Sequence, residues 1–328
     1  MKEGVAREGP SDPGVRARRG RIVAPAALAL AAAILVSCAS SEAPRLALEY
    51  YELGNAWLQM EKWDKAGAAY EKALSYDRSL VAASYNLARA LTEAGLYPRA
   101  LEAVDRLLAE DPDNVRLLTL KAYTLHKAGD DDAALAAYRR ASVLNPRDAP
   151  TLRNLAFLLE KTGEYKEARG ILRELHAVDP SDDAVLRRLA LLETRLLREY
   201  SAGTGLGADG SGDDAETLLS ASLARDPRDR ELLRARAELR EERELFALAL
   251  EDWAALVKED AADGEAWFRL ARIRLVVAGD REAGLEALRR ALDAKFSDPK
   301  AARALLTALP EAERAVPAGM LKAAGLTE

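Results

Sequence analysis

The residue with the most distinctive chemistry in this chain of 328 residues is Cys38, its only cysteine. Cys38 ends an alanine- and leucine-rich run, in the stretch LALAAAILVSCASS, and its neighbours are small. The chain has no second cysteine to form a disulfide with this thiol. The alternative interpretation is a buried or incidental cysteine after a failed membrane anchor.

The residues before Cys38 have the organisation of an export signal. Arg16, Arg18, Arg19 and Arg21 form a basic patch, and the fifteen residues of 22–36 are uncharged and mostly apolar. A membrane-spanning helix requires roughly 20 such residues, so this run is short. A basic region followed by a short apolar core and small residues is typical of a signal peptide.

The sequence Leu35-Val36-Ser37-Cys38 resembles the lipobox of bacterial lipoproteins. The resemblance implies cleavage before Cys38, a diacylglycerol on its sulfur and an acylated amine. It predicts a removed signal peptide over 1–37 and a lipidated tether over 38–46. Ala39 follows the cysteine where an aspartate would favour the inner membrane, so the resemblance favours the outer membrane facing the periplasm. The outer face of the plasma membrane is the alternative.

The charge of the chain argues against nucleic acid as a partner. Removing residues 1–37, with six basic and three acidic residues, leaves 42 basic and 51 acidic residues and a net charge of −9. Nucleic acids and anionic lipid surfaces repel such a chain. Attachment to a membrane is therefore expected through the lipid anchor only.

Residues that could perform catalysis are scattered. The two histidines, His126 and His176, are fifty residues apart, and the sequence has no glycine-rich phosphate loop, no Gly-x-Ser-x-Gly motif and no cluster with metal-ligand spacing. General acid–base catalysis requires a positioned pair of groups. The sequence therefore predicts no enzyme, no cofactor and no metal, and leaves a wall-directed enzyme with an unrecognised site as an alternative.

Four prolines reveal an internal repeat. Pro112, Pro146, Pro180 and Pro227 follow one another at intervals of 34, 34 and 47 residues. A fixed period of 34 is typical of stacked helix-turn-helix repeats. The longer interval contains thirteen additional residues, and the insertion falls at the glycine- and serine-rich segment 201–212, which is expected to be a flexible loop. This insertion is either a flap that contacts a partner or a tolerated surface loop.

Residues 50–76, YYELGNAWLQMEKWDKAGAAYEKALSY, resemble the tetratricopeptide repeat (TPR). The signature places are occupied by Tyr50, Leu53, Gly54, Trp57, Ala66, Tyr70 and Ala73. The resemblance implies an all-α fold, a right-handed superhelical solenoid of about seven TPR helix-turn-helix repeats within 47–298. Residues 299–328 would add a capping helix and a C-terminal tail. The predicted repeats are 47–80, 81–114, 115–148, 149–182, 183–229, 230–263 and 264–298.

The eighth and twentieth places of every repeat hold only glycine or alanine. These places mark where the two helices of a repeat cross, and a larger side chain would force the backbones apart at a cost of about 1–3 kcal/mol. The fourteen residues are Gly54, Ala88, Ala122, Ala156, Ala190, Ala237 and Ala271, with Ala66, Ala100, Ala134, Ala168, Ala215, Ala249 and Gly284.

Some positions depart from the TPR pattern. Arg78 and Ala261 stand where proline is expected. The eleventh place of the last three repeats is charged rather than apolar, and the last repeat requires one extra residue before Gly279. The register of repeats five to seven is therefore less regular, although they remain helical in character.

In TPR proteins the first helix of each repeat lines a concave groove in which peptides bind. The residues at the corresponding places are Tyr85, Arg89, Arg116, Tyr123, His126, Lys127, Arg153, Phe157, Lys161, Arg187 and Arg195. The segment 115–200 has 15 basic and 13 acidic residues, whereas 39–114 has 8 and 13 and 201–328 has 19 and 25. Because arginine pairs well with carboxylates, we expect a protein or peptide partner with an acidic segment or a free C-terminus. The alternative is a solvated helix face without a ligand.

These observations predict a lipid-anchored scaffold of the bacterial cell envelope that binds partner proteins through the TPR groove, in the assembly of an envelope complex. A second possibility is a purely structural subunit of an envelope machine, held by convex or lateral contacts.

Overall fold

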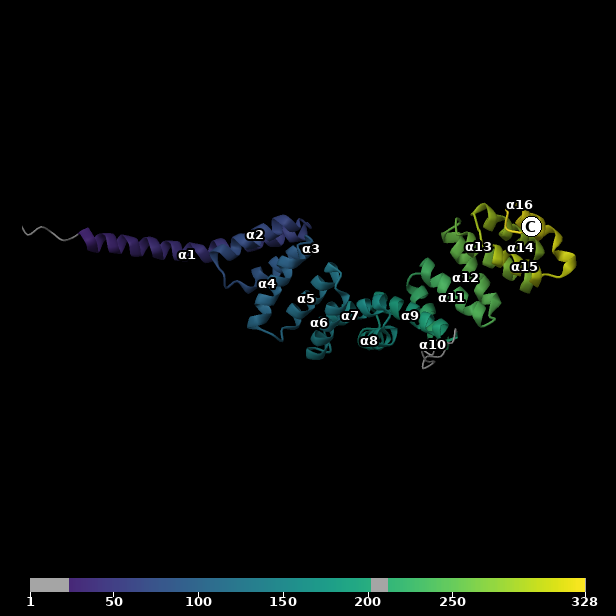
Figure 1. The fold of residues 1–328 in the computed structure, drawn as a ribbon, viewed down its shortest axis with the longest axis horizontal. Coiled ribbons are helices and arrows are strands. Elements are labelled where there is room, and N and C mark those ends of the chain that lie inside the picture. Colours follow the sequence, from purple (N-terminus) through teal and green to yellow (C-terminus); the bar gives the residue numbers. More distant parts are fainter. Residues whose placement is uncertain (1–23, 202–211, 328) are drawn as a thin grey trace, which may run out of the picture. The chain divides into compact units, whose positions relative to one another are not determined.

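The computed structural model describes the backbone of residues 24–201 and 212–327, and their side chains except at 24–41, 200, 201, 212 and 213. The described residues form helices and no strand, so the predicted all-α class is confirmed (Figure 1). The chain divides into two compact units, an N-terminal unit, Met1–Glu110, and a C-terminal unit, Asp111–Glu328.

The helices follow one another as antiparallel hairpins, and each packs mainly against its neighbours in the sequence. The N-terminal unit contains α1 (Ala24–Gln59), α2 (Trp63–Tyr76), α3 (Val81–Glu93) and α4 (Tyr97–Glu110). The first helices of the repeats in the C-terminal unit are α5 (Val115–Ala128), α7 (Ala149–Thr162), α9 (Asp183–Ser201), α11 (Arg230–Glu242) and α13 (Gly264–Arg272). Their second helices are α6 (Asp131–Leu144), α8 (Tyr165–Val178), α10 (Gly212–Arg225), α12 (Phe246–Glu259) and α14 (Arg281–Asp293).

The first helix, α1, includes the segment around the cysteine. The backbone of Leu35, Val36, Ser37 and Cys38 is helical within α1, and so is that of the predicted tether 38–46. The side chains of these four lipobox residues lie outside the described part of the structure. Residues 1–23 of the predicted signal peptide and 202–211 of the predicted insertion also lie outside it. Among the described residues, no helix combines the length and the apolarity needed to cross a bilayer.

The small residues of the eighth and twentieth places lie in the interior, as predicted. The alanines at these places are at most 1 % exposed. A Cβ atom on Gly54 would be 2.5 Å from the ring of Tyr70, and one on Gly284 would be 2.6 Å from Leu275. Glycine at these two crossings therefore gives room to a large side chain of the facing helix.

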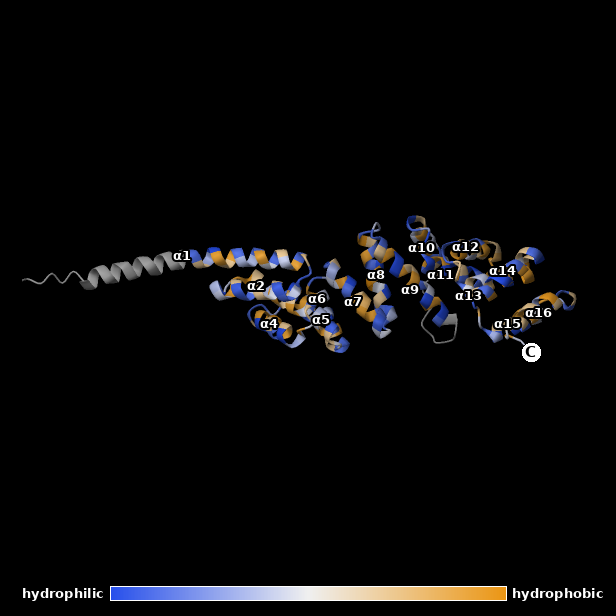
Figure 2. Cartoon of the chain, turned by 90° about the horizontal axis from the view of Figure 1, so that it is seen from above, coloured by the Kyte–Doolittle hydropathy of each residue, from blue (hydrophilic) through white to orange (hydrophobic). Residues whose placement is uncertain are grey.

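Large side chains of the second helices fill the space between hairpins. The residues at the twenty-fourth place are buried: Tyr70, Val104, Tyr138, Leu172, Leu219, Trp253 and Leu288. Figure 2 shows orange hydrophobic and blue hydrophilic residues on the same helices, the amphipathic pattern that helices of a layered fold require.

Aspartate or asparagine begins most first helices. Asn114, Asp148, Asp182, Asp229 and Asp263 accept hydrogen bonds from backbone amides in the first turn of α5, α7, α9, α11 and α13. Such N-caps each stabilise a helix by about 1 kcal/mol. The last residue of the repeat thus fixes where the next repeat begins.

Two of the three charged eleventh places, Glu193 and Arg240, are buried and form ion pairs, whereas the guanidinium of Arg274 donates a hydrogen bond to the carbonyl oxygen of Ala283. Glu193 is buried and pairs with Arg173 at 2.7 Å. Arg240 is buried and pairs with Asp252 at 2.8 Å and with Glu216 at 3.0 Å. In these repeats an ion pair replaces an apolar contact between helices, which explains the departure from the usual pattern.

The extra residue of the last repeat has a structural counterpart in a π-helical turn, η1 (Ile273–Ala278), that continues α13. A π-helical turn accommodates one additional residue within a helix. After α14, the helix α15 (Pro299–Ala308) occupies the predicted capping segment. A 3-10 turn, η2 (Glu311–Glu313), and α16 (Ala315–Ala323) follow, and Leu305, Leu309 and Leu321 join the hydrophobic core of the last repeats.

Candidate functional site

Guanidinium groups surround a cavity of about 510 Å³ among the first helices of the C-terminal unit. We call it the central cavity. Five arginines and three glutamates line it, together with Tyr165, Thr194 and apolar residues of α9 and α11. The charged residues are Arg187, Arg188, Arg195, Arg198, Arg234, Glu160, Glu231 and Glu238. The excess of positive charge in a recess suits a ligand that carries carboxylates.

Arg195 presents its guanidinium to the central cavity from α9. Its Cζ lies 4.1 Å from the ring centroid of Tyr165, and its side chain is 57 % exposed. Its ion pair, at 3.0 Å, is with Glu199, one turn further along the same helix. Stacking on Tyr165 orders the guanidinium without engaging its donors, so Arg195 is oriented to bind a carboxylate.

Phe157 forms an exposed aromatic surface on α7. This side chain is 51 % exposed, although most phenylalanines are buried. The guanidinium of Arg188 lies 5.8 Å from its ring centroid, and the imidazole of His126 contacts it edge-on at 5.8 Å between centroids. Arg188 also pairs with Glu160 at 2.7 Å. Phe157 therefore offers apolar contact beside the charged cavity.

His126, Asp131 and Lys161 form a polar cluster next to Phe157. Asp131 accepts from Nδ1 of His126 at 2.6 Å and pairs with the Lys161 ammonium at 2.8 Å. The hydrogen bond from Lys161, followed by that from His126, holds the pKa of Asp131 below its usual value. The ionised carboxylate therefore orients both the imidazole and the ammonium beside the ring of Phe157.

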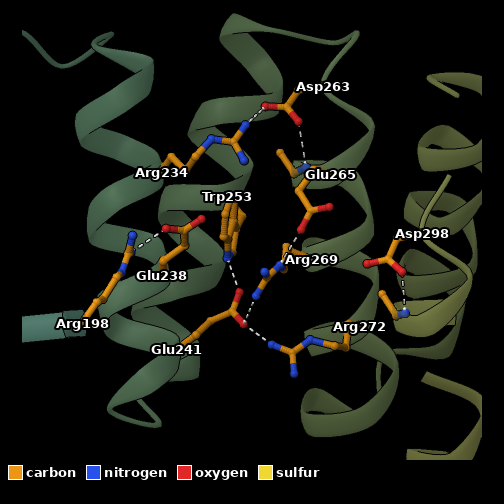
Figure 3. Close-up of polar contacts among 12 residues, drawn as sticks. Arg198, Arg234, Glu238, Glu241, Trp253, Asp263, Glu265, Arg269, Arg272 and Asp298 are labelled. Atoms are coloured by element: carbon orange, nitrogen blue, oxygen red, sulfur yellow. Dashed lines mark hydrogen bonds and ion pairs between the residues drawn. The ribbon is translucent and has the colours of Figure 1, made fainter. Parts of the chain in front are cut away.

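The arginines at the fifth place of three repeats contact the N-cap of the next first helix. Arg153 pairs with Asp182 at 2.5 Å, Arg187 pairs with Asp229 at 2.6 Å, and Arg234 pairs with Asp263 (Figure 3). We call this series the cap ladder. Each rung ties one repeat to the aspartate that starts the next, so these three arginines stabilise the stacking of the repeats.

The electrostatics of the cap ladder agree with its geometry. Burial alone would raise the pKa of Asp229, but the hydrogen bond from Arg187 and the amide of Leu232 outweigh it, and the pKa lies below the usual value. Asp182 behaves in the same way: the amide of Val185 and Arg153 outweigh the effect of burial on its pKa. The hydrogen bond to Asp229 raises the pKa of Arg187. Asp182, Asp229 and Arg187 are therefore ionised near neutral pH.

A second polar network extends the cavity toward the C-terminal repeats (Figure 3). Arg198 pairs with Glu238 at 2.5 Å. The buried carboxylate of Glu241 accepts a hydrogen bond from Nε1 of Trp253 at 2.5 Å and pairs with Arg269 and Arg272. These contacts join α9, α11, α12 and α13 through charged groups.

The structure brings together only part of the predicted groove. His126 and Lys161 both pair with Asp131, Phe157 contacts the ring of His126, and Arg187 and Arg195 line the central cavity. Tyr85 and Arg89 belong to α3 in the N-terminal unit, so the structure does not place them beside the others. The remaining predicted residues are on α5 and α7: Arg116 and Lys127 are exposed, Tyr123 is half-buried with Lys127 5.8 Å from its ring centroid, and Arg153 belongs to the cap ladder.

Sequence reasoning missed several residues of the cavity. Arg188 occupies the sixth place of its helix, which the usual groove places do not include, and Arg198 lies in the extended end of α9, a helix of 19 residues. Tyr165 starts a second helix. A signal for the cap ladder was present: an arginine at the fifth place accompanies an aspartate 29 residues later in Arg153 and Arg234. Among the described residues, no group of acidic, histidine or cysteine side chains could hold a metal ion.

Comparisons with known proteins agree with this architecture. Residues 58–122 and 125–192 match the family model described as tetratricopeptide repeat. The chain has the TPR fold. No protein among the curated ones matches the chain.

Comparison with solved structures found matches at low sequence identity. The chain is similar to YrrB, described as a TPR protein with an unusual peptide-binding site, at 18% identity and a TM-score of 0.51, over 62% of this chain and 98% of YrrB. It is also similar to a TPR protein from Parabacteroides merdae, at 18% identity and a TM-score of 0.49, over 80% of this chain and 98% of that protein.

Proposed function

We propose that this TPR protein is a lipid-anchored scaffold of the bacterial cell envelope, which binds an acidic segment or C-terminus of partner proteins in the central cavity. The observation that carries this proposal is the pairing of an exposed phenylalanine, Phe157, with a cavity that has five arginines and three glutamates. TPR proteins commonly bind proteins or peptides, and the mechanism here is binding and positioning without turnover.

Arg195 and Arg188 are the groups that would meet the acidic residues of the partner. Arg195 is exposed and stacked on Tyr165, and Arg188 lies over Phe157. An apolar side chain of the partner would contact Phe157 while a neighbouring carboxylate pairs with these guanidiniums. Arg153 and Arg187, by contrast, are engaged in the cap ladder, and their replacement would affect the fold as well as binding.

The lipid anchor in this proposal rests on the lipobox resemblance at Cys38. Each buried methylene of an acyl chain contributes about 0.8 kcal/mol, and several chains anchor a protein stably. Anchoring would confine the search for partners to the membrane surface and raise their effective concentration. The proposed location is the outer membrane, facing the periplasm.

A cross-linking experiment in intact cells tests the binding face. A photo-reactive amino acid in place of Phe157 should capture specific proteins, which mass spectrometry identifies. The matched control is the same substitution at Val178 on α8, which is 82 % exposed. Capture of the same proteins from both positions, or no capture from Phe157, would contradict the proposed binding face.

The anchor is tested separately with Cys38→Ser. We expect incorporation of labelled palmitate into the native protein and none into the variant, and we expect the variant to leave the membrane fraction. Palmitate-free native protein, or an unchanged distribution of the variant, would contradict the lipid anchor without bearing on the cavity.

A further inference from the structure

A second recess lies in the N-terminal unit, on helices that do not contribute to the central cavity. It is a cleft of about 840 Å³ between α2, α3 and α4. Its apolar wall includes Leu74, Leu87 and Leu107, which are half-buried, and Val81, which is 59 % exposed. A cleft this large with an open apolar wall requires a cause in the sequence, since interiors of proteins are normally filled.

Comparison of the repeats indicates that Ser84 leaves this cleft unfilled. It stands at the fourth place of the second repeat and lines the cleft. The fourth place of every other repeat holds a large apolar or aromatic residue, namely Tyr50, Leu118, Leu152, Leu186, Leu233 or Trp267. The four leucines are buried, at most 7 % exposed. The second repeat therefore lacks the side chain that fills this place elsewhere in the chain.

Arg78 is a second departure from the repeat pattern, and it lines the same cleft. It occupies the place where four later repeats have proline. Among the described residues, its guanidinium has no ion-pair partner, whereas Arg99 on the facing wall pairs with Glu71 at 2.6 Å. Two independent departures thus place a missing apolar side chain and an unpaired positive charge in one recess.

We propose that this cleft is a second docking site, which binds a partner protein through one bulky apolar side chain next to a carboxylate. The apolar side chain takes the place that leucine, tyrosine or tryptophan fills in the other repeats, against Leu87 and beside Ser84. The carboxylate pairs with Arg78 at the rim. Of the six charged residues that line the cleft, three are basic and three are acidic. The cleft therefore favours a partner with one carboxylate placed next to Arg78 over a partner that is strongly acidic throughout.

This inference does not depend on the proposed function of the central cavity, because it concerns other helices and a different chemical signal. A variant that loses binding at one site and keeps it at the other therefore distinguishes failure of this inference from failure of the proposed function.

The test uses a small probe that has both features. N-acetyl-L-tryptophan carries an indole, the side chain found at the fourth place of the last repeat, and a carboxylate. Titrated into the intact chain, it should cause saturable NMR shifts in the methyl signals of Leu74, Leu87 and Leu107. N-acetyl-L-tryptophanamide, which lacks the carboxylate, should bind several-fold more weakly.

Two variants and two matched controls examine the mechanism. Ser84→Leu should fill the cleft, raise the melting temperature and abolish the shifts, and Arg78→Gln should remove the preference for the acid over the amide. Ala82→Leu on α3 and Lys72→Gln on α2 change exposed residues outside the cleft. These two controls should leave the methyl shifts and the preference for the acid over the amide unchanged.

Three results would overturn the proposal: no saturable shift of the Leu87 methyl signals, equal shifts in Ser84→Leu, or equal binding of acid and amide to the native chain. Dodecanoate, a fatty acid, is titrated in parallel as a third probe. Shifts caused by dodecanoate and not by N-acetyl-L-tryptophan would show that the cleft takes an acyl chain, which also overturns a protein partner.

Discussion

Tyr70 and Trp253 occupy the same place in the first and the sixth repeat, but they are held by different chemistry. The hydroxyl of Tyr70 donates to the neutral amide of Asn55 at 2.9 Å, which also accepts from Asn86 at 3.1 Å. The indole of Trp253 donates to Glu241, a buried carboxylate that also pairs with arginines of the next repeat. The same helical hairpin is therefore closed by neutral hydrogen bonds in the first repeat and by charges in the sixth.

This difference shows that the TPR fold requires filled crossings rather than one kind of contact. A neutral bond in the interior contributes about 1 kcal/mol net. A buried carboxylate is costly to desolvate, and the loss of Glu241 leaves the buried indole N–H of Trp253 and two half-exposed guanidiniums without this acceptor. The last repeats should therefore respond far more strongly than the first to the loss of one polar side chain.

Removal of Glu241 is expected to have the largest effect. Glu241→Ala leaves Arg269, Arg272 and the indole of Trp253 without their common acceptor and should cost about 3 kcal/mol of unfolding free energy. Asn55→Ala should cost about 1 kcal/mol. Urea denaturation followed by circular dichroism measures both. Similar losses in the two variants would contradict the distinction between charged and neutral crossings.

A methyl group added at a helix crossing is expected to cause the second largest loss of unfolding free energy. Gly54→Ala would bring Cβ to 2.5 Å from the buried ring of Tyr70, and the expected cost is about 1–3 kcal/mol. Gly170→Ala on α8 is the matched control, because a Cβ there meets nothing within 4 Å. Thermal denaturation should show the control stabilised by about 0.5–1 kcal/mol through helix propensity. Destabilisation of both variants alike would exclude close packing as the reason for the glycine.

Removal of one aspartate of the cap ladder is expected to cause a smaller loss of unfolding free energy. Asp229→Ala removes the N-cap of α11 and the partner of Arg187, and should cost about 1–2 kcal/mol. Asp226→Ala, an exposed residue of the preceding turn, is the control and should cost less. If both variants melt at the same temperature as the native chain, the ladder does not stabilise the stacking.

The dependence of stability on pH should have opposite signs for the paired aspartates and for the buried tyrosine. Asp131, Asp182 and Asp229 have lowered pKa values in the folded state, so their stabilisation is present above the unfolded pKa of about 3.9 and is lost as the pH falls below it. Burial raises the pKa of Tyr70 to about 12, so its contribution is present below pH 10 and is lost as the pH rises toward 12. Stability curves of the intact chain at acidic and alkaline pH check both signs.

The sequence allowed the hairpins to be predicted because packing constraints recur with the period. Gly54 and Gly284 mark crossings, the residues 299–308 are helical as α15, and the extra residue before Gly279 is accommodated by the turn η1. These features depend on local spacing, which a sequence displays directly.

The partners of the charged groups could not be predicted in the same way. Arg153, Arg187 and Arg195 look equivalent as basic residues at groove places, yet two pair with cap aspartates and one stacks on Tyr165. Which carboxylate a guanidinium meets depends on side-chain conformation and on the angle between helices, neither of which the period determines. For the same reason Arg188 and Arg198 were missed.

The most direct test of the account compares Arg195→Glu with Arg187→Glu in one pair of measurements. Binding of a labelled glutamate-rich peptide with a single phenylalanine is followed by fluorescence anisotropy, and unfolding is followed by circular dichroism, with Arg147→Glu as an exposed control. We expect Arg195→Glu to weaken binding about tenfold or more without loss of stability, whereas Arg187→Glu should lower the unfolding free energy. Unchanged peptide binding by Arg195→Glu, or full stability of Arg187→Glu, would contradict this expectation.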